Sequence, residues 1–278
     1  MKKISRDWTC SLFAAFASVA FVLAGCAIGQ TGPAPSWNGD TVTPAGTTTS
    51  IPVVVAQSQP APRRNTAIVP AQGNVRTNQR HNAFVNTAKT GDFDILFAGD
   101  SITDWWQQSG AQGGTDVQKK YFGDVKVANF AVAGDTTQGV LWGLQNGEGQ
   151  GRKPKAVMLM IGTNNASGNN TAAEIAEGVG AIVVELRKDF PDAKILLLAI
   201  FPRGAGPTDR TRVKNDDVNK LIAKLDDGQH VFFKNINDKF LNPQGGLIGF
   251  RNDNLHPTAQ GYDIWAQAVA DTLKEWAK

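Results

Sequence analysis

The chain has 278 residues, 41% of them hydrophobic, and a formal net charge of +3 at pH 7, of which Lys2, Lys3 and Arg6 against Asp7 contribute +2. The remainder of the chain has a net charge near +1 and lacks the basic excess of a nucleic-acid-binding protein, so a nucleic-acid partner is excluded. Length and apolar content are sufficient for a substantial core.

Residues 1–26 have the layout of an export signal. Basic residues precede an apolar stretch, 12–23, and the segment ends in Leu23-Ala24-Gly25-Cys26. The apolar stretch is too short for a membrane-spanning helix. The ending resembles a bacterial lipoprotein signal, which implies cleavage before Cys26 and lipid attachment to it. An ordinary signal peptide and an uncleaved anchor are the alternatives, and each of the three sends the domain across a membrane.

This interpretation sets the expected location. We expect a protein held to the cell envelope by the lipid on Cys26, on the periplasmic or surface side. Ala27 is not the acidic residue that accompanies inner-membrane retention, which favours the outer membrane. Cys10, the other cysteine of the chain, lies inside the signal, so the exported part has no cysteine for a disulfide.

Residues 27–74 are predicted to be a disordered tether. They are rich in Pro, Thr, Gln, Ala and Gly, and only Asp40, Arg63 and Arg64 are charged. Such a segment cannot bury enough apolar surface to fold alone. The small apolar island 51–56 offers an alternative, because it could pack as an extra edge strand.

The remainder, 75–278, is predicted to be one α/β domain with helices on both faces of a parallel sheet, because strand-length and helix-length segments alternate along it. Short apolar runs bounded by turn residues are typical of buried parallel strands, and apolar residues at helical spacing mark the segments between them. The predicted strands are 95–98, 125–130, 157–161, 195–200 and 231–234, and the predicted helices are 79–89, 172–189, 213–225 and 259–276.

The first predicted strand ends in Gly99-Asp100-Ser101, which places a hydroxyl at the carboxyl end of a strand. Ligands of open parallel sheets bind at this edge, so Ser101 is a candidate nucleophile. Asp100 and Ser101 are also residue types that commonly cap a helix, and for this turn alone capping explains both without any chemistry.

The next two predicted strands are followed by hydrogen-bond donors. Gly134, in the turn after the second strand, lets a backbone amide approach a substrate oxygen, and Asn164, after the third, carries a side-chain amide. With the amide of Ser101 they would form a three-donor oxyanion hole for a tetrahedral intermediate. Singly, Gly134 is an ordinary turn glycine and Asn164 an ordinary cap. Their occurrence at successive strand ends favours the site.

His256 is the candidate general base. Asp253 precedes it by three residues, and a carboxylate at that spacing can fold back onto one ring nitrogen while the other accepts the proton of a serine. A lone Asp-x-x-His also fits a turn cap beside a surface histidine. His81 and His230 have no such neighbour, and we expect structural roles for both. No cluster of His, Cys and acidic residues has metal-ligand spacing, so no metal site is predicted.

Taken together, these segments resemble the SGNH or GDSL-type hydrolases, which are named for a Ser, Gly, Asn and His in four blocks. The blocks are Gly99–Ile102, Gly134, Gly162–Asn165 and Asp253-x-x-His256. Within that family the chain is most similar to the catalytic subunits of intracellular platelet-activating-factor acetylhydrolases, and this likeness runs from His81 to the C-terminus. It rests on Asn129-Phe130, Gly134–Thr137, Val140–Trp142, Asn146–Glu148 and Pro202–Gly204.

The resemblance implies a three-layer α/β/α flavodoxin-like sandwich with a five-stranded parallel sheet, ester hydrolysis through an acyl-enzyme on Ser101, and no cofactor. One departure is Asn165, where many relatives have Asp, although the acetylhydrolases also have Asn. A larger departure is the compartment, because those relatives are cytosolic and this chain carries an export signal.

We therefore predict a serine ester hydrolase that removes short acyl groups, mainly acetyl, with an acetylated glycan as the preferred substrate. Trp105 and Trp142 are candidate substrate-binding residues because aromatic rings suit sugar faces, and helix-to-sheet packing is the alternative for both. Two other functions stay open: a non-catalytic glycan-binding envelope protein on the same fold, and a lipid-directed esterase. The absence of a long apolar lid segment favours soluble substrates. The oligomeric state is not predicted.

Overall fold

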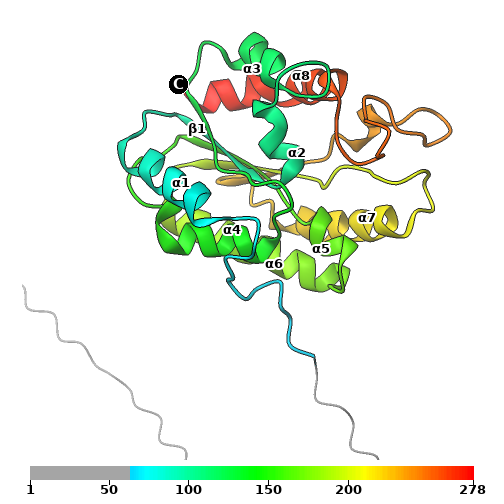
Figure 1. Ribbon diagram of the computed structural model, residues 1–278, viewed down its shortest axis with the longest axis horizontal. Helices are drawn as coiled ribbons and strands as arrows, with labels where there is room; N and C mark the ends of the chain where they lie inside the picture. Colours follow the sequence, from blue (N-terminus) through cyan, green and yellow to red (C-terminus); the bar gives the residue numbers. More distant parts are fainter. Residues whose placement is uncertain (1–62) are drawn as a thin grey trace, which may run out of the picture. The chain divides into compact units, whose positions relative to one another are not determined.

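The computed structural model describes residues 63–278, whose core is a single parallel sheet (Figure 1). The strands follow one another in the order β2-β1-β3-β4-β5, and every neighbouring pair is parallel. This is the strand order of flavodoxin-like sheets, which confirms the predicted fold class. The strands are β1 (Ile95–Gly99), β2 (Val127–Asn129), β3 (Ala156–Met160), β4 (Lys194–Leu198) and β5 (Val231–Lys234).

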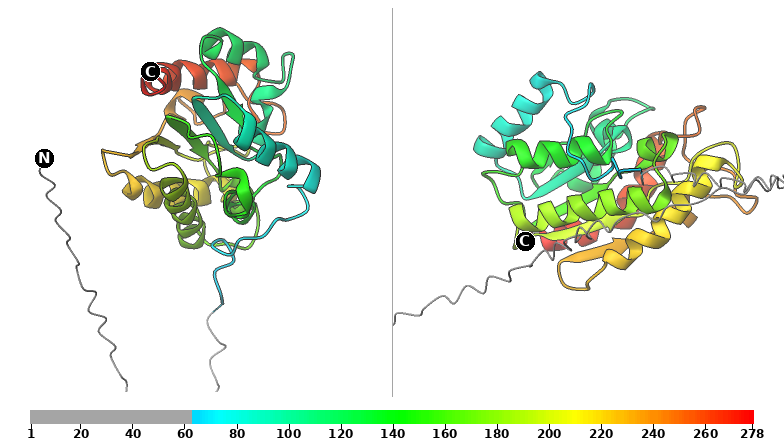
Figure 2. Two further views of the ribbon diagram at one scale, coloured as in Figure 1. Left: turned by 90° about the vertical axis from the view of Figure 1, so that its left-hand side faces the viewer. Right: turned by 90° about the horizontal axis from the view of Figure 1, so that it is seen from below.

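Helices cover both faces of the sheet, because alternate strand residues point to opposite sides. In β1, Leu96 belongs to one apolar core and Phe97 to the other. Figure 2 shows the helices of the first face side by side. That face carries α1 (Asn78–Thr90), α4 (Thr137–Gly143), α6 (Ala172–Asp189) and α7 (Arg210–Ile222), and the other carries α3 (Thr115–Phe122) and α8 (Ala259–Trp276).

Helices α1, α6 and α7 each begin where a side chain caps them. A capping box between Thr171 and Glu174 starts α6, and the bounds of α6 and α8 are those predicted from the apolar spacing. Helix α7 starts three residues earlier than predicted, because the carboxylate of Asp209 accepts hydrogen bonds from the backbone amides of Thr211 and Arg212. It ends in a 3-10 turn, η3 (Ala223–Leu225).

Short helical segments occupy the connections for which the sequence predicted no element. Besides α3 and α4, they are α2 (Ser101–Asp104), η1 (Trp105–Gln107), η2 (Leu144–Glu148), α5 (Thr163–Ser167) and η4 (Asn237–Phe240). Both α2 and α5 follow a strand with only one or two residues between, at the carboxyl edge of the sheet, and therefore carry the candidate site.

The folded domain begins earlier than the predicted position 75. Ala67 is fully buried, and its carbonyl accepts a hydrogen bond from Thr137 Oγ1 at 2.9 Å. The side chain of Asn65 donates to Glu177 in α6 at 2.7 Å. Composition alone does not reveal a segment held by a few polar contacts and one small apolar residue. The predicted signal with Cys26, residues 27–62 of the predicted tether and the island 51–56 lie outside the described residues.

Candidate active site

Ser101 is the first residue of α2, immediately beyond the end of β1. Asp100 caps this helix, its Oδ1 accepting a hydrogen bond from the amide of Ile102 at 3.0 Å. Burial raises the pKa of Asp100 to about 7. The charge of Asp135 also raises this pKa, and the hydrogen bond from the amide of Ile102 lowers it. A Cβ on Gly99 would lie 2.4 Å from the carbonyl oxygen of Met160, so only glycine lets this turn lie against β3.

A hydrogen-bonded chain links the hydroxyl of Ser101 to His256 and Asp253. Ser101 Oγ lies 2.9 Å from His256 Nε2, and His256 Nδ1 lies 2.7 Å from Asp253 Oδ2. The other oxygen of Asp253 accepts the backbone amides of Leu255 and His256, each at 2.9 Å, which fixes the carboxylate against the ring. The geometry is that of a nucleophile, a base and the group that orients the base.

The protonation states suit these positions. Burial lowers the pKa of His256 below 6.5, and the charges of Arg251 and Arg203 lower it further. Asp253 raises the pKa, but by less than these effects lower it. For Asp253, burial raises the pKa, but the hydrogen bonds from His256 and Leu255 outweigh it and hold the pKa below its usual value. At neutral pH the ring is therefore a free base beside an ionised carboxylate.

The two predicted oxyanion donors lie on neighbouring segments of the same edge. Gly134 has a φ of 83°, a conformation that favours glycine. Asn164, the second residue of α5, donates from Nδ2 to the carbonyl of Asp135 at 2.7 Å. Asp135, the residue after Gly134, thus holds the side-chain amide of Asn164. Ser101 stands at the end of β1, the strand that lies between the two strands preceding these donors. One of the two N–H groups of Asn164 is used by this contact, and the other remains for a ligand.

Trp105 packs at the edge of the apolar core that contains Phe97 and lies against the candidate base. Its ring centroid is 3.9 Å from that of His256, and the guanidinium of Arg251 lies 4.1 Å above its ring. Arg251 also donates to the side chain of Gln108 at 2.7 Å and, from Nε, to the carbonyl of Pro257 at 3.3 Å. Arg251 thus ties the loop that carries His256 to the segment that follows Ser101.

Trp142, the other predicted substrate-binding residue, is placed differently. Among the described residues its only aromatic neighbour is His81 in α1, with ring centroids 4.7 Å apart. His81 also has the acidic partner that the sequence did not reveal, Glu148, whose Oε1 lies 2.8 Å from Nδ1. Trp142, in α4, therefore contacts a side chain of helix α1, whereas the alternative interpretation was packing of a helix against the sheet.

Behind the donors lies a buried ionic network around Arg76. Its guanidinium, 1% exposed, binds the carboxylate of Asp135 at 2.7 Å and that of Glu148 at 2.6 Å. Burial raises the pKa of Asp135, opposed by the charge of Arg76. Because Asp135 follows Gly134 and its carbonyl holds Asn164, Arg76 supports the segment that carries Gly134 and, through it, the side chain of Asn164.

Several of these residues had no signal in the sequence. Arg76 and Arg251 are single arginines with distant partners. Asn165 was noted only as a departure, yet it is buried and its side chain accepts the amide of Thr137 at 3.0 Å and donates to Gln138 at 2.8 Å, joining α5 to α4. Within residues 63–278 no group of three or more His, Cys, Asp and Glu side chains is arranged to hold a metal ion.

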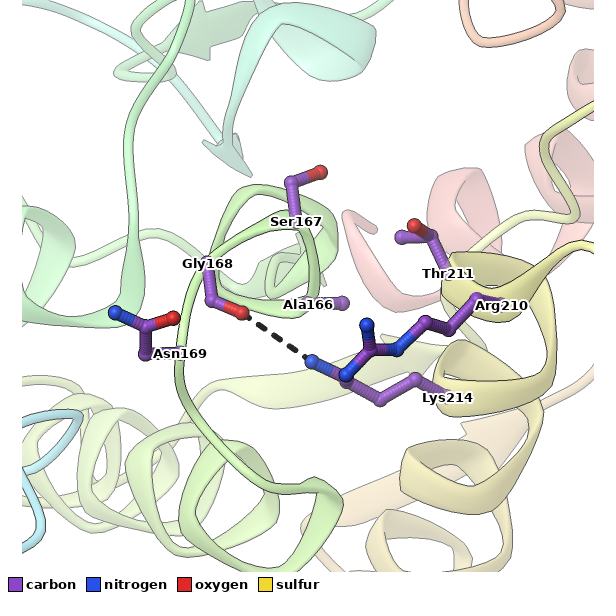
Figure 3. Close-up of a pocket in the computed structure, with 7 residues that line it drawn as sticks. All are labelled: Ala166, Ser167, Gly168, Asn169, Arg210, Thr211 and Lys214. Atoms are coloured by element: carbon purple, nitrogen blue, oxygen red, sulfur yellow. Dashed lines mark hydrogen bonds between the residues drawn. The ribbon is translucent and has the colours of Figure 1, made fainter.

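A polar pocket of about 290 Å³ lies between α7 and α5, the helix that carries Asn164 (Figure 3). Ser167 lies at its α5 side and accepts a hydrogen bond from Arg203 at 2.9 Å. Arg203 also donates to Thr163 Oγ1 at 3.1 Å. The pocket is lined by Ala166, Ser167, Gly168, Asn169, Arg210, Thr211 and Lys214.

Among residues 63–278, no helix is long and apolar enough to cross a membrane.

Comparison with known proteins gives concordant matches. The family model described as GDSL-like Lipase/Acylhydrolase matches residues 97–264. Platelet-activating factor acetylhydrolase IB subunit alpha2 of Rattus norvegicus is 37% identical over 193 residues, covering 69% of this chain and 80% of that protein. The alpha1 subunit of the same organism is 33% identical over 210 residues, covering 75% and 87%.

Solved structures also share the fold. A GDSL-like lipase from Bacteroides thetaiotaomicron matches with a TM-score of 0.56 at 18% identity, over 71% of this chain and 98% of that one. Est24, a carbohydrate acetylesterase from Sinorhizobium meliloti, matches with a TM-score of 0.51 at 19% identity, over 66% and 99%.

Proposed function

This chain belongs to the GDSL-like lipase/acylhydrolase family and is a carboxylic ester hydrolase, and on that premise we propose that it removes acetyl groups from glycans through an acyl-enzyme on Ser101. Membership of a hydrolase family sets aside the non-catalytic glycan-binding alternative. The observation that carries the proposal is the unbroken chain from Ser101 Oγ through His256 to Asp253.

The geometry supports a definite sequence of steps. Ser101 Oγ attacks the ester carbonyl carbon while His256 Nε2 takes its proton, and Asp253 stabilises the imidazolium that forms. The oxyanion of the tetrahedral intermediate accepts hydrogen bonds from the amides of Ser101 and Gly134 and from Asn164 Nδ2. His256 then protonates the departing alcohol. A water molecule, deprotonated by His256, releases the carboxylic acid and restores Ser101.

Acetyl is the proposed acyl group because two relatives at 37% and 33% identity are acetylhydrolases by name. A glycan is the proposed alcohol because the pocket beside the site is lined by polar and charged groups, which suit a hydroxyl-rich leaving group better than an acyl chain. The lipid-directed alternative would require an apolar surface at the same place.

Hydrolysis of nitrophenyl acetate tests the assignment. Purified protein should show faster turnover of the acetate than of the octanoate ester, and Ser101→Ala should lose roughly 10⁶-fold in kcat while its melting temperature is retained. Acetate released from an acetylated oligosaccharide then tests the glycan. Activity unchanged in Ser101→Ala would refute the nucleophile, and a preference for the octanoate would refute the acetyl assignment.

We also propose that the enzyme acts in the cell envelope, held by lipid on Cys26. Only the signal-like sequence of residues 1–26 supports this. Expressed in a bacterium, the full chain should fractionate with membranes, and Cys26→Ala should abolish incorporation of labelled fatty acid. Equal labelling of both forms would refute the anchor.

A further inference from the structure

The pocket between α5 and α7 has the position and charge of a second binding site, and this inference rests on the proposed function. We propose that it binds the carboxylate of a uronic acid, so that the preferred substrate is an acidic acetylated glycan whose charged sugar lies beside the acetylated one.

Its position places it next to the reacting ester. Asn164, the side-chain oxyanion donor, and Ser167, which lines the pocket, are three residues apart in α5. Residues at this spacing lie on the same helix face, with Cβ atoms about 5–6 Å apart. The pocket therefore begins about one sugar ring away from the carbonyl that Asn164 would hold.

Arg203 connects the catalytic residues with the pocket. Its guanidinium donates to the hydroxyl of Ser167, and its charge lowers the pKa of His256 and of Asp100. Arg203 thus lies within electrostatic range of the serine–histidine pair while contacting the rim of the pocket. A substrate bound at Ser101 would extend past Arg203 into the pocket.

The lining of the pocket is cationic. Arg210 and Lys214 both point into it from the first turns of α7 (Figure 3), and no carboxylate is among the lining residues. Lys214 donates to the backbone carbonyls of Gly168 and Asn170 at 3.3 and 3.1 Å, which orient the ammonium without neutralising it. The nearby Asp209 instead uses Oδ1 to cap α7.

Arg210 supplies the specificity for a carboxylate. Within the described residues it makes no side-chain hydrogen bond and no ion pair, so its planar donor fork is available, and that fork matches the two oxygens of a carboxylate. Neutral donors and acceptors on Ser167, Asn169 and Thr211 suit sugar hydroxyls. The volume, at the low end for ligand pockets, fits one sugar residue rather than a chain.

Substrate discrimination tests the inference. The probes are an acetylated oligogalacturonide, an acetylated neutral xylo-oligosaccharide and nitrophenyl acetate. In Arg210→Gln/Lys214→Gln, kcat/KM for the acidic probe should fall roughly tenfold through KM, since both partly exposed ion pairs to the uronate would be lost. The two neutral probes should lose less than the acidic one, and nitrophenyl acetate least, because it has no sugar to enter the pocket. The loss should shrink at 0.5 M salt, as screening predicts.

The matched control is Lys220→Gln, also on α7 but paired with Asp217 and outside the pocket. It alters net charge without altering the pocket and should behave as wild type. Arg210→Lys should retain part of the preference and Arg210→Glu should reverse it. Equal losses on all three probes in the double variant, or equal kcat/KM for acidic and neutral oligosaccharides in the wild type, would overturn the inference.

Binding separates this result from a failure of the proposed function. Titration calorimetry of deacetylated oligogalacturonide into wild type and into Arg210→Gln/Lys214→Gln needs no turnover. Weaker binding in the double variant supports the pocket even if nitrophenyl acetate is not hydrolysed. Equal binding overturns it even if the esterase assignment holds.

Discussion

Residues 63–278 contain two carboxylate–imidazole pairs of nearly the same geometry and different consequence. Asp253 Oδ2 lies 2.7 Å from His256 Nδ1, and Glu148 Oε1 lies 2.8 Å from His81 Nδ1. The carboxylate of the first pair is 44% exposed and that of the second 3%. Only the first pair has a hydroxyl, that of Ser101, on its other ring nitrogen.

The surroundings explain why similar pairs differ. Glu148 shares its second oxygen with Arg76, and the ring of Trp142 lies against His81, so this imidazole belongs to a buried support. His256 instead lies at the carboxyl edge of the sheet, beside Ser101 and the amide donors. An acid–histidine contact is therefore structural unless the free ring nitrogen reaches a nucleophile. The following experiments test that distinction.

The largest expected difference is between loss of the two histidines. His256→Ala removes the base and should lower kcat for nitrophenyl acetate by roughly 10⁶-fold with little change in melting temperature. His81→Ala should lower the melting temperature, because Glu148 loses a buried partner, while kcat stays within a few-fold. Comparable losses of kcat in both variants would remove the distinction between a catalytic and a structural pair.

Arg76→Met tests the buried network as a support. It leaves two buried carboxylates, Asp135 and Glu148, without their cation, and breaking such a pair costs about 3–5 kcal/mol of unfolding free energy. Urea unfolding measures the loss. The exposed pair Lys220–Asp217 provides the control, because Lys220→Met should change stability by no more than about 1 kcal/mol. Similar losses in the two variants would mean that the network contributes no more than a surface pair.

Asn164→Ala examines the donor that this network holds in place. The variant loses one oxyanion contact, and kcat should fall about 10²–10³-fold with KM nearly unchanged. Asn164→Asp preserves the size but replaces the donor by an acceptor, and it should be at least as inactive. Activity retained in Asn164→Ala would leave the oxyanion to the amides of Ser101 and Gly134 alone.

The two pairs also show what the sequence could predict. Asp253 and His256 are three residues apart, so their contact is visible in the chain, whereas His81 and Glu148 are 67 residues apart and meet only after folding. Helices α6 and α8 repeat their apolar spacing over 18 residues and were predicted with their bounds. The short helices α2 and α5, of four and five residues, have no measurable period.

The same limit applies around the candidate site. Ser101, Gly134 and Asn164 stand at strand ends, where the alternation of elements already predicts a ligand edge. The sandwich of Arg251, Trp105 and His256 depends on ring positions, and Trp105 was therefore assigned to substrate rather than to the base. Polar partners separated by loops of irregular length give no spacing from which a contact can be predicted.

The smallest expected effect is a shift of pH dependence at His256, which distinguishes its exposed pair from the buried one. Burial and the charges of Arg251 and Arg203 lower the pKa of His256, while Asp253 raises it. The neutral ring is the active form, so the acid limb of kcat/KM should have its midpoint below 6.5. Arg251→Gln removes one charge that lowers the pKa of His256, so this pKa rises and the acid limb should move to higher pH. Activity should be lost at pH 6 and kept at pH 8.

Arg251→Lys keeps the charge and should keep the limb in place even if kcat falls. Equal shifts in both variants would mean that Arg251 acts through packing on Trp105 and not through its charge.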